Sequence, residues 1–175
     1  MNNKIFSFLS LLIVILSSCE NQDMNFSDFD YQTVYFANQF PVRTLQLGND
    51  LFIDTSIDNQ HKVEIKATMG GVYKNKTDKV ISFKVDNSLC DGLYFDDDTK
   101  IIPMPSEYYE LSSDKIVIPS KSIIGGVEVQ LTDAFFSDPL TIDRTYVIPL
   151  LMTDVTGADS ILQGEPLVDT PNRFI

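Results

Sequence analysis

Hydrophobic and polar residues alternate with a period of two along several segments of the chain. In residues 62–67, Val63, Ile65 and Ala67 share one face of an extended chain, while lysine and glutamate side chains share the other. Residues 81–86 and 127–132 repeat this alternation. Because successive side chains of a β-strand point to opposite faces, the pattern predicts strands with one buried and one solvated face.

Shorter segments rich in β-forming residues extend this pattern. They cover residues 31–37, 42–47, 108–111 and 115–118, and the longest covers 145–153. Turn-forming residues separate the segments, at 48–50, 74–78, 96–98, 112–114 and 125–126. No segment after the first nineteen residues has a helical period. The sequence therefore predicts an all-β fold, an antiparallel immunoglobulin-like β-sandwich of about seven to eight strands.

Residues 146–152 differ from the other predicted strands because they are apolar on both faces. A strand of this kind is expected in the centre of a sheet. Pro149 lies within it, and proline has no backbone N–H to donate to a neighbouring strand. We therefore expect a bulge or an unpaired stretch at Pro149.

The first residues have the features of an export signal. A polar start that contains Lys4 precedes a short apolar stretch, which ends at Leu16-Ser17-Ser18-Cys19. A membrane-spanning helix needs about 20 apolar residues, whereas the apolar part of a signal peptide has about 7 to 15. Small residues before a cysteine resemble a bacterial lipobox, so residues 1–18 are predicted to be a signal peptide and Cys19 to carry lipid. The alternative is an ordinary signal peptide with an incidental cysteine, which leaves the residues before Cys19 unexplained.

This interpretation divides the chain into four parts. Residues 19–30 would form a lipidated, flexible tether, residues 31–164 the β-sandwich domain, and residues 165–175 a linker or truncated tail. The lipid anchor would place the protein in the cell envelope as an outer-membrane lipoprotein, either surface-facing or periplasmic. Stable anchoring needs more than one acyl chain, and a mature bacterial lipoprotein carries several.

The charge of the chain limits its partners. It has 13 basic and 25 acidic residues, which gives a formal net charge of −12. Such a surface repels nucleic acid and anionic lipid headgroups, so lipid rather than charge would supply the membrane attachment. If Cys19 is acylated, Cys90 has no partner for an internal disulfide, and stability must come from the core.

Several segments resemble a known family. They are Gly-Gly-Val-Tyr at 70–73 and residues 80–86, 102–111, 115–120, 145–150 and 157–160. Together they resemble the N-terminal β-sandwich module of Bacteroidetes surface lipoproteins, over roughly residues 28–164. This domain of unknown function lies upstream of glycan-binding domains and of family 18 endo-β-N-acetylglucosaminidases. The resemblance implies a role in glycan acquisition beside neighbouring glycan-uptake proteins. The spaced acidic run of the family 18 hydrolases does not occur in this sequence, so no enzyme activity is implied.

Pairs of adjacent aromatic residues are the candidate contacts for a carbohydrate. Sugar rings usually stack on exposed aromatic faces, and the chain has no tryptophan to serve in this way. Neighbours in a strand point to opposite faces, so both members of a pair cannot enter one core. The alternative is that one member fills the core and the other covers a loop. The candidates are Tyr108 and Tyr109, Tyr94 and Phe95, and Phe135 and Phe136.

Other residues suggest chemistry only weakly. Asp96, Asp97 and Asp98 could supply oxygen ligands to Ca²⁺, but they lack the spacing of a calcium loop and favour a solvated turn. No metal or cofactor is therefore predicted. His61 and Cys90 could form a nucleophile and base, but nothing in the sequence places them together, which favours a buried thiol and a histidine at a strand end. Glu107 and Glu110 would point to opposite faces of a strand.

The sequence thus predicts a non-catalytic module of a cell-envelope lipoprotein. It would act as a spacer or an accessory glycan-binding domain in a system that acquires polysaccharides or glycoprotein glycans. The alternative is a fimbrial or adhesin-type structural subunit, because such subunits are also lipidated β-sandwiches and assemble by strand addition.

Overall fold

The computed structural model describes residues 26–37, 45–95, 97–142 and 146–162. The predicted signal peptide (residues 1–18), Cys19 and residues 163–175 lie outside this part of the chain. The described strands are β1 (Thr33–Phe36), β2 (Lys62–Gly70), β3 (Lys79–Val85), β4 (Ile102–Pro103), β5 (Tyr109–Leu111), β6 (Lys115–Ile118), β7 (Ile124–Leu131), β8 (Tyr146–Val147), β9 (Leu150–Thr156) and β10 (Ser160–Ile161). Short helices connect some of them: η1 (Asp58–Gln60), η2 (Asn87–Cys90), η3 (Ser106–Tyr108), α2 (Asp133–Ser137) and η4 (Pro139–Thr141).

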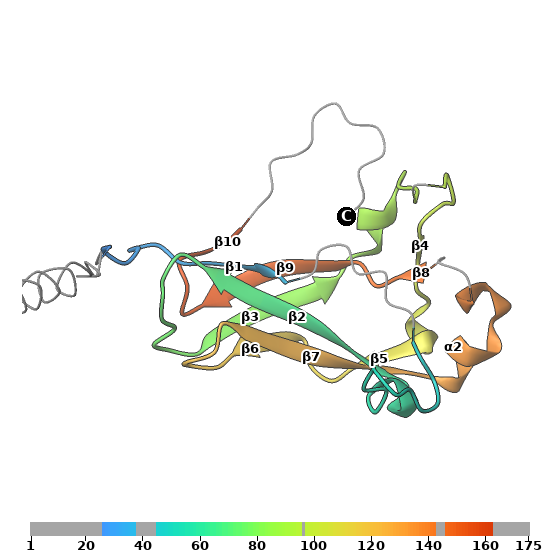
Figure 1. The fold of residues 1–175 in the computed structure, drawn as a ribbon. Coiled ribbons are helices and arrows are strands. Elements are labelled where there is room, and N and C mark those ends of the chain that lie inside the picture. The colour runs from blue at the N-terminus through green and yellow to red at the C-terminus, as the bar shows by residue number, and fades with distance from the viewer. Residues whose placement is uncertain (1–25, 38–44, 96, 143–145, 163–175) are drawn as a thin grey trace, which may run out of the picture.

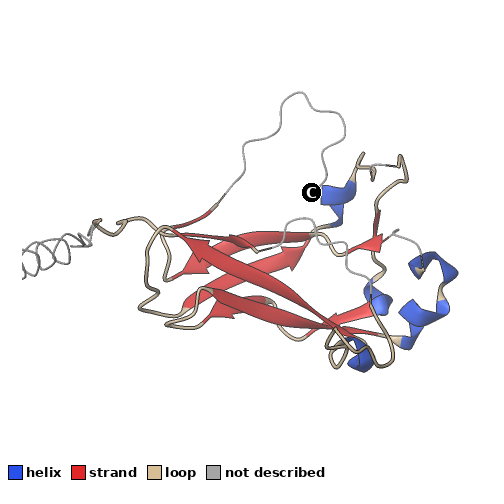
Figure 2. Ribbon diagram, viewed as in Figure 1, coloured by secondary structure: helices blue, strands red, loops and turns tan. Residues whose placement is uncertain are grey.

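The strands form three sheets (Figures 1 and 2). The largest has five strands in the order β10-β1-β2-β7-β5, the second has three in the order β6-β3-β9, and β4 pairs with β8. The pairing is antiparallel within the second sheet and through most of the first. Two pairs are parallel, β1 with β10 and β4 with β8.

The two larger sheets share one hydrophobic core. Both contribute to a cluster of buried side chains made up of Val34, Ala67, Met69, Ile81, Phe83, Ile116, Ile118, Val127 and Met152. Each fully buried aliphatic side chain contributes about 1.5 to 3 kcal/mol through removal from water. The alternation predicted for residues 62–67, 81–86 and 127–132 is confirmed, because one face of each strand reaches this cluster while residues such as Glu64, Lys84 and Glu128 are exposed.

The mostly β character of the fold is confirmed, but its details differ from the expectation. Residues 133–137 form a short α-helix, in which Phe135 and Phe136 lie side by side, so these two are not strand neighbours. Residues 45–47 form no strand, and the rest of the predicted 42–47 strand lies outside the described residues. The immunoglobulin-like arrangement of strands is not shown, and it stays a prediction.

Residues 125–126, predicted as a turn, lie inside β7 instead. Gly125 pairs with Ala67 of β2, and the connection to β6 is made by residues 119–123. A Cβ atom on Gly125 would collide with the backbone carbonyl of Val117 in β6. The glycine therefore allows β6 and β7 to approach closely where the two sheets meet, and its role is close packing rather than turning.

The segment predicted as one central strand is divided into β8 and β9. Residues 148 and 149 separate these strands, as expected from the missing N–H of Pro149, whose carbonyl oxygen accepts a hydrogen bond from the backbone N–H of Asp86 at 2.9 Å. The prediction of a central position is wrong: among the described residues, β9 pairs only with β3 and lies at the edge of its sheet. Its outward side chains, including Leu151, are exposed, so apolar residues on both faces do not mean burial on both.

The domain has two distinct ends (Figure 1). Residues 26–32 approach β1 at one end, where the β2–β3, β6–β7 and β9–β10 connections also lie. Helices η1, η3 and α2 and the β4–β8 pair lie at the opposite end. The first described residues and the helical segments are thus separated by the length of the sheets.

Neighbouring residues of β6 provide a test of the shared core. Ile116 is completely buried, whereas Val117 points outward with 42% of its surface exposed. Ile116→Ala should lower the free energy of unfolding by about 2 to 5 kcal/mol, because it leaves a cavity between the sheets. Val117→Ala should change it by only about 0.5 kcal/mol. Urea unfolding followed by circular dichroism measures both, and equal losses would contradict the assignment of Ile116 to the core.

Candidate functional site

Aromatic side chains contact one another on segments that lie at the end of the domain opposite residues 26–32, where Figure 1 shows α2 and β8. They come from four separate segments of the chain. We call this group the aromatic cluster; it consists of His61 after η1, Tyr108 at the end of η3, Phe135 and Phe136 in α2, and Tyr146 in β8.

The rings of the aromatic cluster contact one another mainly edge to face. Tyr108 lies 5.7 Å from Tyr146 and 6.3 Å from Phe135, measured between ring centroids, and both pairs are nearly perpendicular. Phe135 and Phe136 are 5.2 Å apart at 81°. Aromatic pairs prefer such geometries, with centroids about 4.5 to 7 Å apart. Much of the ring surface is therefore used for packing within the cluster.

Asp138 joins the two tyrosines of the cluster. Its Oδ2 accepts a hydrogen bond from the Tyr108 hydroxyl at 3.0 Å and another from the Tyr146 hydroxyl at 2.8 Å. Its Oδ1 accepts one from the backbone N–H of Leu140 at 2.9 Å, which caps η4. One carboxylate thus connects η3, the α2–η4 segment and β8, three segments that no continuous sheet holds together.

These hydrogen bonds shift the pKa values of all three groups. The Leu140 N–H, followed by the two tyrosine hydroxyls, lowers the pKa of Asp138. Donation to the Asp138 carboxylate raises the pKa of Tyr146 to about 12 and also raises the pKa of Tyr108. At neutral pH the carboxylate is therefore ionised and both hydroxyls are protonated. This favours a structural connection and makes Asp138 a weak base and the tyrosines weak acids.

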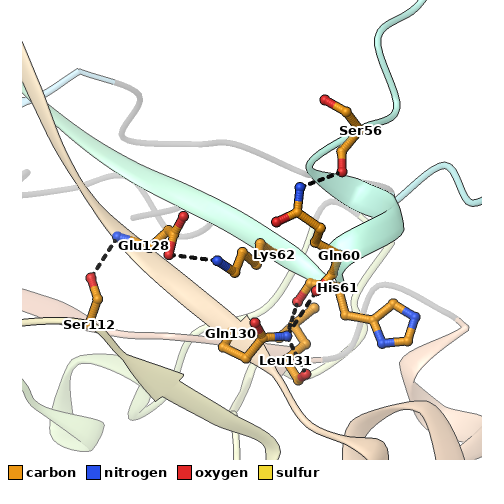
Figure 3. Close-up of polar contacts among 8 residues, drawn as sticks. All are labelled: Ser56, Gln60, His61, Lys62, Ser112, Glu128, Gln130 and Leu131. Atoms are coloured by element: carbon orange, nitrogen blue, oxygen red, sulfur yellow. Dashed lines mark hydrogen bonds and ion pairs between the residues drawn. The ribbon is translucent and has the colours of Figure 1, made fainter.

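His61 is held in place by the side chain of Gln130 in β7 (Figure 3). The Gln130 side-chain amide donates hydrogen bonds to the backbone carbonyls of Gln60 at 3.0 Å and His61 at 3.2 Å. The backbone N–H of Leu131 also donates to the His61 carbonyl, at 2.8 Å. His61 adopts a left-handed backbone conformation, with φ of 59°, which is uncommon for a residue other than glycine. Its ring lies against that of Phe136, with the ring centroids 4.1 Å apart and the planes tilted by 38°. The polar contacts of β7 therefore fix one edge of the cluster.

The structure brings together only some of the aromatic residues singled out from the sequence. Tyr108, Phe135 and Phe136 belong to the aromatic cluster. Tyr109 is half-buried at the start of β5, and burial raises the pKa of its hydroxyl. Tyr94 and Phe95 lie in a separate loop, where Tyr94 forms a β-bridge with Lys100. Whether any of these rings contacts a sugar stays a prediction.

The acidic residues of the same loop form a turn. Asp97 accepts a hydrogen bond from the backbone N–H of Thr99 at 3.1 Å, and Asp98 adopts a left-handed conformation. Asp96 lies outside the described residues. Within the described ranges, no group of three or more histidine, cysteine or acidic side chains is arranged to hold a metal ion.

The remaining candidate pairs are not assembled into a catalytic group. Cys90 is buried in η2, and burial, together with the charge of Asp91, raises the pKa of its thiol. No hydrogen bond or ring contact between Cys90 and His61 is found among the described residues. Glu107 lies in η3 rather than in a strand, so the expected alternation does not apply to it; both it and Glu110 are exposed.

Two residues that hold the aromatic cluster together were not identified from the sequence: Asp138 and Tyr146. The Asp138-Pro139 pair does have a local signal, because aspartate before proline is typical of a helix cap. Its tyrosine partners are 30 and 8 residues away along the chain, however, and no local pattern predicts that they meet.

Comparisons with known proteins identify the family. A family model described as a "-like, N-terminal domain" matches residues 29–159, well over half of the chain. The chain belongs to this family. A solved structure of a Bacteroides ovatus protein of unknown function is similar, with 61% identity and a TM-score of 0.76. The match covers 82% of this chain and 46% of that protein, so this chain spans less than half the length of that relative.

Two other solved structures are similar at lower levels. One is a Bacteroides ovatus protein provisionally named a carbohydrate binding protein, with 17% identity, a TM-score of 0.45, and coverage of 75% of this chain and 34% of that one. The other is a two-domain protein of unknown function from Bacteroides fragilis, with 14% identity, a TM-score of 0.32, and coverage of 59% and 32%. None of the curated proteins compared with the chain matches it. The described residues include no helix of the length and apolar character required to cross a membrane.

Replacement of Asp138 tests its connection to the two tyrosines. Tyr146 has a folded-state pKa of about 12, above its ordinary value of 10.0, so its contribution to stability is present below pH 10 and is lost as the pH rises through about 12. In Asp138→Asn the neutral side chain no longer favours the protonated hydroxyl, and Tyr146 should ionise closer to pH 10. The ultraviolet absorbance of tyrosinate during alkaline titration measures this shift. Asp133→Asn, in the first turn of α2, should titrate like the unaltered protein; a similar profile for both variants would contradict the connection.

Proposed function

We propose that this chain is the N-terminal, non-catalytic module of a cell-envelope lipoprotein in a glycan-acquisition system. The module would be anchored to the outer membrane through lipid on Cys19. Its main role would be that of a spacer, which separates the membrane from the glycan-handling parts of the protein. An accessory glycan-binding role is a finer form of the same proposal.

One observation carries the spacer role. The chain enters the domain at one end, and the segments that carry the aromatic cluster, among them α2 and β8, lie at the other end, across the length of the sheets (Figure 1). The titratable groups at that end are engaged with their neighbours: Asp138 accepts hydrogen bonds from two tyrosine hydroxyls, and the His61 ring lies against Phe136. Loops whose polar and aromatic groups are satisfied by one another suit a structural spacer better than catalysis.

Family membership supports the same proposal. The chain belongs to a family of N-terminal domains, and its 61% identical relative is more than twice as long as the part this chain covers. A module at the start of a longer protein lies next to the export and anchoring signals expected at residues 1–19. The acidic composition of the chain also favours attachment through lipid rather than through charge.

Lipid attachment is tested by replacing the predicted acylation site. In a Bacteroides host fed an alkyne-labelled fatty acid, the unaltered protein should carry the label and fractionate with the outer membrane. Cys19→Ser should lose the label and leave the membrane fraction, because the thiol that accepts the lipid is absent. Cys90→Ser is the matched control and should keep the label. An unlabelled parent protein would contradict the lipoprotein proposal.

Glycan binding is tested on the purified domain. If the domain is a spacer alone, a glycan array should retain none of it, because the rings of its aromatic cluster pack on one another. Retention that Phe136→Ala or Tyr94→Ala reduces would establish the accessory binding role instead, since both rings are partly exposed. Retention unaffected by these substitutions and by Tyr108→Ala would place a glycan elsewhere on the surface.

The fimbrial alternative makes a different prediction about assembly. Structural subunits joined by strand addition form ladders of multimers that resist detergent, because each donated strand completes a neighbouring sheet. A single monomer band after mild detergent treatment supports the spacer, whereas a ladder would favour the structural subunit.

A further inference from the structure

Large apolar side chains are exposed around the end where the chain enters the domain. They come from residues 26–31, the β2–β3 connection and the β6–β7 connection. We call this surface the entry face; its apolar members, with the exposed fraction of each, are Phe26 (71%), Phe29 (61%), Tyr31 (58%), Tyr73 (60%) and Ile123 (60%). Four of the five are aromatic.

The first of these segments is held against the domain. Asp28 Oδ1 accepts hydrogen bonds from the backbone N–H groups of Phe29 and Tyr73, each at 2.9 Å. The rings of Phe29 and Tyr73 lie 6.1 Å apart. Gln32 N–H donates to Asp159 Oδ2 at 2.7 Å. The aromatic rings are therefore presented on a defined surface rather than on a loose tether.

The two connections are also joined to each other. The Asn75 side-chain amide, which is buried, donates to the backbone carbonyls of Pro119 and Ser122, both at 2.9 Å. The Lys121 N–H donates to the Asn75 carbonyl at 2.9 Å. These bonds hold Ile123 and Tyr73 at the same end of the domain, where Figure 1 shows both connections beside residues 26–32.

The entry face carries lysines beside its carboxylates, whereas the chain as a whole is strongly acidic. Lys74, Lys76 and Lys121 are exposed, and none is in an ion pair among the described residues. Carboxylates lie on this face too: Asp30 is exposed, and Asp28, Asp78 and Asp159 accept hydrogen bonds from the backbone N–H groups of Tyr73, Ser120 and Gln32. The entry face thus combines aromatic rings with charges of both signs, although the chain as a whole has a net charge of −12.

The opposite end also has exposed apolar residues, but its charges are different. Phe52 is 95% exposed at the tip of a loop that also contains Asp50 and Asp54, and neither of these acids has an ion pair in the described part of the chain. An acidic surface of this kind is repelled by anionic headgroups. Aromatic side chains with lysines are the composition found at membrane–water interfaces.

We infer that the entry face rests on the lipid bilayer, with its aromatic rings in the headgroup region. The inference rests on the proposed lipidation of Cys19. Six residues lie between Cys19 and Phe26, and even when this stretch is fully extended it spans only about 25 Å, so the entry face is the part of the domain closest to the anchor. Apolar surface buried in the bilayer adds to the attachment that the acyl chains supply, and here it would also fix the orientation of the domain. The domain would then stand upright, with the aromatic cluster directed away from the bilayer.

Single tryptophan reporters test this orientation, because the natural chain has no tryptophan. Tyr73→Trp places a reporter in the entry face, and Phe52→Trp places a matched, exposed reporter at the opposite end. The mature chain from residue 19, which keeps every described residue, is coupled through the Cys19 thiol to a maleimide lipid. Cys90 is buried and does not compete. The vesicles contain phosphatidylethanolamine, phosphatidylglycerol and brominated phosphatidylcholine.

The Tyr73→Trp chain should lose emission to the brominated lipid and shift to shorter wavelength, whereas Phe52→Trp should do neither. Adding Phe29→Ser to Tyr73→Trp should reduce the quenching, with an unchanged circular dichroism spectrum showing that the fold is intact. Equal quenching of the two reporters, or none of either, would overturn the inference. The chemical coupling works whether or not cells acylate Cys19, so absence of the fatty-acid label in cells would refute the lipoprotein proposal alone.

Discussion

The structure depends on one constraint: two sheets must bury one face each against the other. Ile81 and Ile116 from the smaller sheet and Val127 from the larger meet in a single cluster, and the strands that carry them are long enough to keep an alternating pattern. With Cys90 unpaired and buried, no disulfide among the described residues supplements this core. Everything outside it, including both ends of the domain, is held by shorter strands and individual hydrogen bonds.

The two ends of the domain are held together by different contacts. At the end with the aromatic cluster, Asp138 and the edge-to-face rings connect η3, α2 and β8, so that polar and aromatic groups are satisfied by one another. At the entry face, Asp28, Asp159 and Asn75 bind backbone groups and leave the aromatic rings and lysines exposed. The first arrangement closes a surface, and the second leaves one available for a partner.

The long strands could be predicted from the sequence, because burial of every second residue produces an alternation of apolar and polar residues within each strand. The break at Pro149 was also predictable, since it follows from the missing N–H of one residue. The edge position of β9 was not, because its apolar outer residues resemble those of a buried strand. The turn expected at Gly125 was wrong for a related reason: a glycine is required there because the backbone of Val117 in another strand lies too close for a side chain, and the residues next to Gly125 in the sequence do not reveal this contact.

Of the candidate site, Tyr108, Phe135 and Phe136 were identified from the sequence, whereas Asp138 and Tyr146 depend on contacts between distant segments.

The parallel pairing of β1 and β10 bears on how the domain would carry load. The first and last described strands lie side by side and run in the same direction, joined through Thr33 with Ser160 and Val34 with Ile161. A force that pulls the start of β1 away from the end of β10 would slide these two strands along each other. The hydrogen bonds between them would then resist together, instead of opening one after another as in a peeled hairpin. Two sliding strands of this kind act as a mechanical lock between the point where the chain enters the domain and the point where it leaves.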